Sequence, residues 1–384
     1  MDEKEYLQTL GEQIVNPHAR ASILAEIQDH IEEQAQDYRA SGMSEAVAMQ
    51  EAVRQMGDPV STGEALNQVH RPKFPIALFG LAVVLTVLGI AMQYLVYTHL
   101  TPDTAILSDT YLQRTILYNA IGLGLLLLCI FGNYMYLAKG AWILLAIFLL
   151  GLLPPWFFGF YGRQYTLCYY LALVYPLVYA LLLYRLRDKG AKAIWFLHGL
   201  TLLFLVRMLF GTIITWSTVL AAGCLTLLLL CLAIHRGILT GSSKRTLWLL
   251  TVLPYVAAAA CFVILFFQNS YMRDRLTEFL KGSNYVQQML ALEQQQMLAF
   301  GGGTISSYVD TESLASTYVL HSIFLWFGIV SGILVIVALA VLVLRSLHYA
   351  LHQSNRLALL AGTAASGILL FELLHFVLTN LGCS

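Results

Sequence analysis

The sequence predicts an all-α fold: a polytopic α-helical membrane protein with about nine spans and a small helical domain before them. Three observations support this prediction. Apolar residues make up 58% of the chain and its mean hydropathy is +0.70. Only 25 of the 311 residues after residue 73 are charged, and they separate apolar runs of about 20 residues. This composition excludes a soluble enzyme, a disordered chain and a disulfide-rich secreted domain.

The formal net charge of zero is the sum of two unlike segments. Residues 1–73 hold 13 acidic and 6 basic residues, whereas residues 74–384 hold 9 acidic and 16 basic ones. We therefore expect two domains, an acidic helical domain of the signalling type over 1–73 and a transmembrane domain over 74–384. The basic residues are scattered between apolar runs, so nucleic-acid binding is not expected.

Residues 1–73 have the apolar spacing of several short helices. This segment resembles the permease-prefix type of N-terminal domain that is attached to several bacterial membrane proteins. The resemblance rests on three motifs in order, which are Glu26-Ile27-Gln28-Asp29-His30-Ile31-Glu32-Glu33, Gly42-Met43-Ser44-Glu45-Ala46 and Met56-Gly57-Asp58-Pro59-Val60. It implies a signalling or interaction module.

The apolar runs predict nine membrane helices, several of them long enough to cross a hydrocarbon core. They lie near 74–97, 114–137, 141–160, 165–184, 193–211, 214–234, 246–267, 318–344 and 357–379. Twelve basic residues fall near one set of helix ends and about six near the other. The positive-inside rule then places the N-terminal domain in the cytoplasm and the C-terminus outside, in a multi-pass protein of the bacterial plasma membrane.

The longest predicted outer segment is 268–317. It contains an amphipathic, Gln-rich stretch at 285–298, three glycines at 301–303, and the acids Asp310 and Glu312. A loop of this length between membrane helices is more often functional than not. The two carboxylates are weak candidates for a catalytic acid and base. Two solvated loop acids are the simpler interpretation.

Ionisable residues are sparse inside the predicted spans, so each is a candidate functional residue. Glu372 and His375 lie three residues apart on one helical face, and Arg207 and His321 lie at a similar predicted depth. We expect Glu372 to form a buried Glu–His or Glu–Arg contact, and we expect these four residues to line a polar, outward-facing cavity. No second Glu-x-x-His is present to complete a metal centre, and no metal is expected.

The order of these parts is similar to the shape, elongation, division and sporulation (SEDS) family of FtsW, RodA and SpoVE. The resemblance covers about 74–384 and is carried by Arg273-Asp274-Arg275-Leu276, Gly301-Gly302-Gly303, Ser316-Thr317-Tyr318-Val319-Leu320, Phe327-Gly328-Ile329-Val330-Ser331-Gly332, the turn from Arg345 to Arg356, and Thr379-Asn380-Leu381-Gly382. Arg163 stands near the family's Arg-Arg-Trp.

The resemblance implies polymerisation of glycan strands from lipid II, with a penicillin-binding-protein-type transpeptidase as partner and no bound cofactor. It makes Arg163, Arg207, Glu372 and His375 candidates for binding a polyprenyl-linked substrate among membrane lipids. The family's proposed catalytic Asp falls on Thr317, whose hydroxyl cannot act as a base near neutral pH. A second family Asp and the segment leading to a tenth helix have no counterpart either.

Three functional hypotheses follow. The preferred one is a divergent SEDS-like protein of cell-wall synthesis, cell shape or division that binds lipid II or a partner with impaired catalysis. The second is an active lipid II glycosyltransferase that uses Asp310 or Glu312. The third is a permease-type transporter, or a truncated product.

Overall fold

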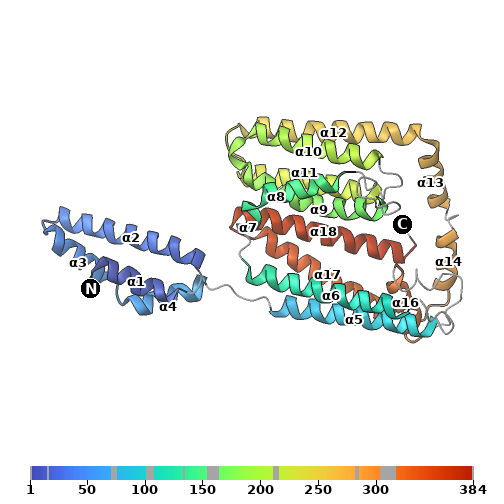
Figure 1. Ribbon diagram of the computed structural model, residues 1–384, viewed down its shortest axis with the longest axis horizontal. Helices are drawn as coiled ribbons and strands as arrows, with labels where there is room; N and C mark the ends of the chain where they lie inside the picture. The colour runs from blue at the N-terminus through green and yellow to red at the C-terminus, as the bar shows by residue number, and fades with distance from the viewer. Residues whose placement is uncertain are drawn as a thin grey trace. The chain divides into compact units, whose positions relative to one another are not determined.

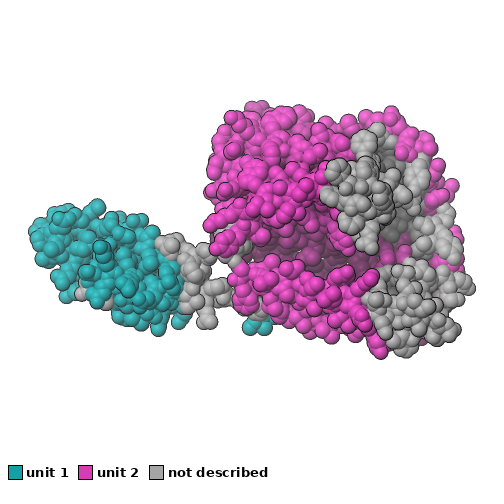
Figure 2. All heavy atoms as spheres, viewed as in Figure 1, with its two compact units in different colours: residues 1–76 teal, residues 77–384 magenta. Residues whose placement is uncertain are grey.

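The computed structural model divides the chain into two compact units, residues 1–76 and 77–384 (Figures 1 and 2). Every regular element among the described residues is helical. The division falls three residues after the change in composition at residue 73. The structure describes residues 2–14, 17–70, 76–100, 108–132, 135–153, 164–210, 216–281, 285–302 and 317–382.

The first unit is a small bundle of four helices with its own apolar core. The helices are α1 (Glu3–Gln13), α2 (Pro17–Ala40), α3 (Glu45–Gln55) and α4 (Pro59–His70). Tyr6, Leu10, Ile14 and Ile31 are almost fully buried in that core. The Tyr6 hydroxyl donates a hydrogen bond to the carbonyl oxygen of Met56 at 3.1 Å, so α1 is tied to the end of α3.

The second unit consists mainly of long apolar helices. Seven helical segments have the length and composition needed to cross a membrane among the described residues. They are Ile76–Leu95, Leu112–Phe131, Leu167–Arg185, Ala191–Met208, Ser217–His235, Ile329–Leu351 and Arg356–Asn380. They belong in order to α5 (Ile76–Leu100), α6 (Ser108–Phe131), α9 (Gln164–Arg185), α10 (Ala191–Phe210), α11 (Trp216–His235), α17 (Ile329–Leu351) and α18 (Arg356–Asn380).

Three predicted spans differ from this set. In the run at 141–160 the described residues form α8 (Ala141–Gly151), which has 11 residues and is too short to cross a bilayer by itself, after the short α7 (Met135–Lys139). The run at 246–267 becomes α12 (Lys244–Gln268), whose 25 residues are long enough to cross a bilayer although it is not among these seven segments. The predicted single helix over 318–344 is wrong, because α16 (Val319–Phe327) and α17 are separate helices.

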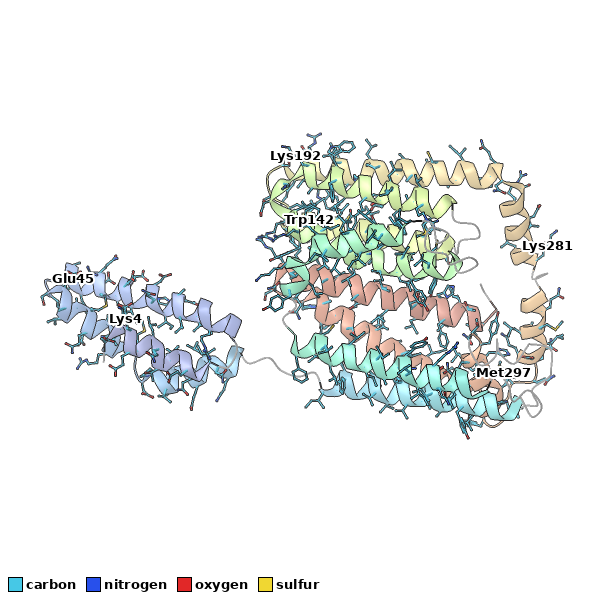
Figure 3. All side chains as sticks on the ribbon, in the orientation of Figure 1. Lys4, Glu45, Trp142, Lys192, Lys281 and Met297 are labelled. Carbon is cyan, nitrogen blue, oxygen red and sulfur yellow. The ribbon has the colours of Figure 1, made fainter. Side chains whose placement is uncertain are left out.

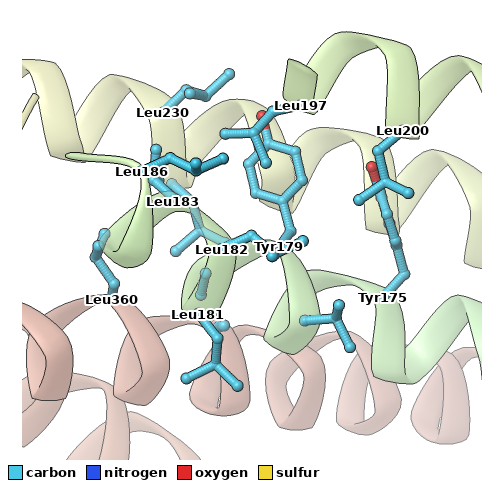
Figure 4. Packing of buried hydrophobic residues seen from close by; sticks show 14 of the residues in the cluster. Tyr175, Tyr179, Leu181, Leu182, Leu183, Leu186, Leu197, Leu200, Leu230 and Leu360 are labelled. Atoms are coloured by element: carbon cyan, nitrogen blue, oxygen red, sulfur yellow. The ribbon is translucent and has the colours of Figure 1, made fainter. Parts of the chain in front are cut away.

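The packing of the second unit centres on α9, which contacts α8, α10, α11 and α18. Figure 4 shows Tyr175 and Tyr179 of α9 among leucines from neighbouring helices. The Tyr175 ring stacks on Phe204 of α10 with a centroid separation of 4.4 Å. Its hydroxyl lies 2.6 Å from the Thr201 hydroxyl, so α9 and α10 share both an apolar and a polar contact.

Two shorter helices, α13 (Ser270–Lys281) and α14 (Tyr285–Gln294), run across one end of the long helices (Figure 1). This end is the one at which α18 finishes. After α14 the chain reaches the joint between α16 and α17. The Ile329 amide donates to the Leu298 carbonyl at 2.9 Å and the Val330 amide donates to the Ala299 carbonyl at 3.3 Å.

Gly328 makes the break between α16 and α17. Its φ is +89°, a backbone conformation that residues with a side chain rarely adopt. A Cβ atom built at this position would lie 2.6 Å from the Ala299 carbonyl oxygen and 2.8 Å from the Phe300 Cα. The break therefore requires glycine both for its backbone angle and for the close approach of the segment at 298–300.

We expect Gly328→Ala to destabilise the second unit by more than about 1 kcal/mol, because the variant adds a left-handed alanine and a backbone clash. The measurement is thermal or denaturant unfolding of the full chain in detergent. Gly122→Ala on α6 is the matched control, since a Cβ there meets nothing within 4 Å. Equal stability of the two variants would contradict this account of the joint.

Candidate functional site

A cluster of buried polar side chains lies where α14, α16 and α18 meet. Glu293 comes from α14, His321 from the first turn of α16, and Asn380 from the last turn of α18. Their exposed fractions are 1%, 0% and 0%. Residues 28 to 87 positions apart in the sequence thus share one desolvated site, and we name Glu293, His321 and Asn380 the α14–α16–α18 cluster.

Glu293 and His321 make the direct side-chain contact of this cluster. The His321 Nε2 lies 2.8 Å from a carboxylate oxygen of Glu293, which is hydrogen-bonding distance. Desolvation of two such groups costs several kcal/mol per charge unless they are paired. Both side chains are separated from solvent, so their mutual hydrogen-bonding distance stabilises each of them there.

Asn380 uses both ends of its amide group. Its Oδ1 accepts a hydrogen bond from the His321 backbone amide at 2.9 Å, and its Nδ2 donates to the carbonyl oxygens of Thr317 at 3.1 Å and Phe376 at 2.8 Å. The first turn of a helix leaves backbone amides without intrahelical partners. Tyr318 stands at the N-cap of α16 and provides no side-chain cap. Asn380 therefore caps α16 from another helix.

In this cluster a carboxylate lies at hydrogen-bonding distance from an imidazole, so each group satisfies the other away from water. The His321 Nδ1 is buried and has no hydrogen-bond partner. Both side chains are sealed from solvent, so a substrate in solution does not reach either of them in this conformation. The arrangement consequently suits fastening of α14 to the bundle better than direct attack on a substrate.

A second polar contact lies deeper along α18. The Tyr169 hydroxyl of α9 is 2.8 Å from each carboxylate oxygen of Glu372. Glu372 was expected to pair with a histidine or an arginine, and its described partner is instead a tyrosine. A neutral hydroxyl satisfies the carboxylate without adding a second charge to the apolar region.

The other residues of the predicted cavity have separate partners. The Arg207 Nε donates to the Leu152 carbonyl at 2.7 Å, and the His375 ring packs at 5.8 Å from the Phe371 ring. Within the described part of the chain no hydrogen bond or ion pair joins any two of Arg207, His321, Glu372 and His375. Arg163, Asp310 and Glu312 lie outside the described residues.

Thr317 stands at the edge of the α14–α16–α18 cluster. Its backbone carbonyl accepts from Asn380, and the residue itself is exposed. The described residues hold no group of three His, Cys, Asp or Glu side chains that is arranged to bind a metal ion. The site is therefore a buried Glu–His contact beside an amide that caps α16.

Sequence reasoning missed Glu293, Asn380 as a helix cap, and Tyr169. Glu293 is the single acid in a Gln-rich amphipathic stretch, and that isolation was an available signal. The contact between His321 and Glu293 joins two segments 28 residues apart, and Glu293 lies outside the predicted spans. Spacing along one helix could not identify such a partner.

Comparison with known proteins finds a family match in the N-terminal region of the chain. The HAAS family model matches residues 5–61, which include most of α1, all of α2 and α3, and the first three residues of α4. The match covers the segment in which the three prefix motifs occur. No curated protein matches the chain, and no solved structure does so either.

We expect Glu293→Ala to free α14 from the bundle, because the variant leaves His321 buried without its partner. Loss of one member of a buried pair typically costs about 3–5 kcal/mol. Hydrogen–deuterium exchange of the full chain should then rise over 285–302 while the core of α9 stays protected.

Asp274→Ala is the control for this variant, since Asp274 is an exposed acid on α13. It removes the same charge from the same outer segment without opening a buried pair. Equal exchange in the two variants would show that the Glu293–His321 contact does not fasten α14.

Proposed function

We propose that this chain is a SEDS-like multi-pass protein of the bacterial plasma membrane that acts in cell-wall synthesis, cell shape or division. In this proposal it binds lipid II, another polyprenyl-linked substrate or a penicillin-binding-protein-type transpeptidase, and it has lost the polymerising reaction. Its HAAS domain is a cytoplasmic module that communicates the bound state, and its C-terminus lies outside.

The observation that carries this proposal is the hydrogen bond from Asn380 Nδ2 to the Thr317 carbonyl at 3.1 Å. Both residues belong to segments that resemble SEDS motifs, one before the eighth predicted span and one at the end of the last. Their contact at one end of the bundle supports a shared architecture, because nothing in the sequence spacing of 63 residues requires it.

The loss of catalysis follows from the chemistry at the same point. A hydroxyl occupies the position of the family's carboxylate, and the nearest described acid–base pair is Glu293 with His321. That pair is sealed, and a general base must come within hydrogen-bonding distance of the proton it removes. Substrate binding without polymerisation is the activity that remains.

The outer segment provides the surface for such binding. α13 and α14 run across the end of the long helices, and the chain then returns to the joint at Gly328 (Figure 1). A polyprenyl-linked substrate has its tail in the bilayer and its sugars outside, so this end is where its head group would meet the protein.

The test uses the purified full chain with labelled lipid II, in separate binding and polymerisation assays beside an active SEDS polymerase. We expect saturable binding and no glycan product above the protein-free control. Arg207→Gln and Glu372→Gln should weaken binding by severalfold if those side chains contact the substrate.

Glycan product that is abolished by Asp310→Ala or Glu312→Ala would overturn the loss of catalysis and establish the glycosyltransferase alternative. Absence of both binding and product, together with uptake of a solute into proteoliposomes, would favour a transporter.

A further inference from the structure

The loops before α10 and α12 are locked together at the end of the bundle opposite the α14–α16–α18 cluster. The Thr240 amide donates to the Arg187 carbonyl at 2.9 Å, and the Ala191 amide donates to the Ser242 Oγ at 3.0 Å. A Cβ atom on Gly190 would lie 2.8 Å from the carbonyl carbon of Gly241. The two loops therefore present one fixed surface instead of two independent ones.

α10 and α12 are also held in register. The His198 Nε2 lies 2.9 Å from the Leu250 carbonyl oxygen. His198 is the eighth residue of α10 and Leu250 is the seventh of α12. Because each residue rises about 1.5 Å along a helix, the two helices begin at nearly the same level. Figure 3 labels Lys192 at this end of α10.

Four exposed basic residues lie at or just before the starts of these two helices. They are Lys189, Lys192, Lys244 and Arg245. The one acid in the two loops is Asp188. It lies 3.8 Å from the Arg187 Nε and accepts a hydrogen bond from the Thr240 hydroxyl at 3.3 Å, so its charge is opposed by its own arginine neighbour. The surface keeps a strong positive charge, which attracts anions.

A tryptophan follows one turn inside each helix. Trp195 comes three residues after Lys192, and Trp248 comes three residues after Arg245. The two indole side chains are 63% and 37% exposed. Residues three apart share a helical face, so each base lies above a tryptophan on an outward face. Tryptophan favours the level of the lipid headgroups.

The same outward faces continue as apolar stripes. Leu202 and Val206 are exposed on α10, seven and eleven residues after Trp195, and Val252 and Val256 are exposed on α12, four and eight residues after Trp248. A ligand for this surface thus meets positive charge at the helix starts, indole rings below them, and aliphatic side chains further along. The helix starts themselves are already capped, with Ser242 accepting from Ala191 and Ser243 from Thr246, so the side chains supply the charge.

We propose that the paired starts of α10 and α12 form a binding site for the headgroup of an anionic phospholipid. The four bases pair with phosphate oxygens, the two tryptophans lie at the glycerol level, and the acyl chains follow the aliphatic side chains on the same faces. A diphosphate lipid such as cardiolipin matches a surface with two bases on each side. The proposal depends on these helices crossing a bilayer and not on the function proposed above.

The ligand chemistry follows from the apolar part of the surface. A soluble polyanion or an acidic protein would use the bases but would leave Trp195 and Trp248 without a role at bilayer depth. The lipid uses both features at once. Its binding would hold α10 and α12 together at the end where the two loops are locked.

The test is a cardiolipin titration of the purified full chain in detergent, with bound lipid counted by native mass spectrometry and phosphatidylcholine as the comparison lipid. We expect cardiolipin to bind in preference to phosphatidylcholine. Lys192→Gln combined with Arg245→Gln should weaken cardiolipin binding roughly tenfold or more.

The matched control is Lys281→Gln with Arg273→Gln, which removes the same two charges from exposed positions on α13. It should leave cardiolipin binding unchanged. Trp195→Leu with Trp248→Leu should weaken binding while preserving the charge, which provides a second variant if the first pair misfolds.

Equal binding of the two lipids would overturn the proposal, as would an equal loss in the control pair. Inorganic pyrophosphate that competes as well as cardiolipin, with no effect of the tryptophan variant, would show a soluble anion site and would also overturn it.

Discussion

The hydrogen bond between His321 and Glu293 is the contact on which the outer end of this protein depends. It joins α14 to α16 across an interior that excludes water, where an unpaired charge would be very costly. Asn380 adds the third helix by capping α16 from α18. With these two contacts α14 and α16 become part of the helical bundle.

This fastening explains why α16 and α17 are separate helices. Gly328 turns the chain with a φ of +89°, and the segment at 298–299 bonds to the first amides after the turn. The buried helix α16 brings His321 and the backbone of Thr317 to Asn380. A single straight helix over 318–344 would carry Thr317 away from this point, since it would have no break at which to change direction.

The two ends of the second unit follow different physical rules. At one end buried polar groups pair inside the protein, so the contacts are specific and depend on shape. At the other, exposed bases and tryptophans surround locked loops, so the surface is suited to a charged amphiphile. The exposed acids of α2, among them Glu26, Asp29 and Glu33, give the HAAS unit the opposite charge character.

Much of the fold could be predicted from the sequence, because long apolar runs and short amphipathic helices leave strong periodic signals. The predicted span at 165–184 lies within α9, for example. The break at Gly328 was not predicted, since glycine is common within membrane helices. Glu293 as the partner of His321 and Tyr169 as the partner of Glu372 were not predicted. Tertiary contacts between distant segments leave no periodic signal in one sequence.

The most direct test of this account is a double-mutant cycle between Glu293 and His321, using Glu293→Gln, His321→Gln and the combined variant in denaturant unfolding of the full chain. The account predicts a coupling free energy well above about 1 kcal/mol, since the two side chains contact each other in a place that water does not reach. A coupling near zero, with the two single effects simply adding, would contradict it.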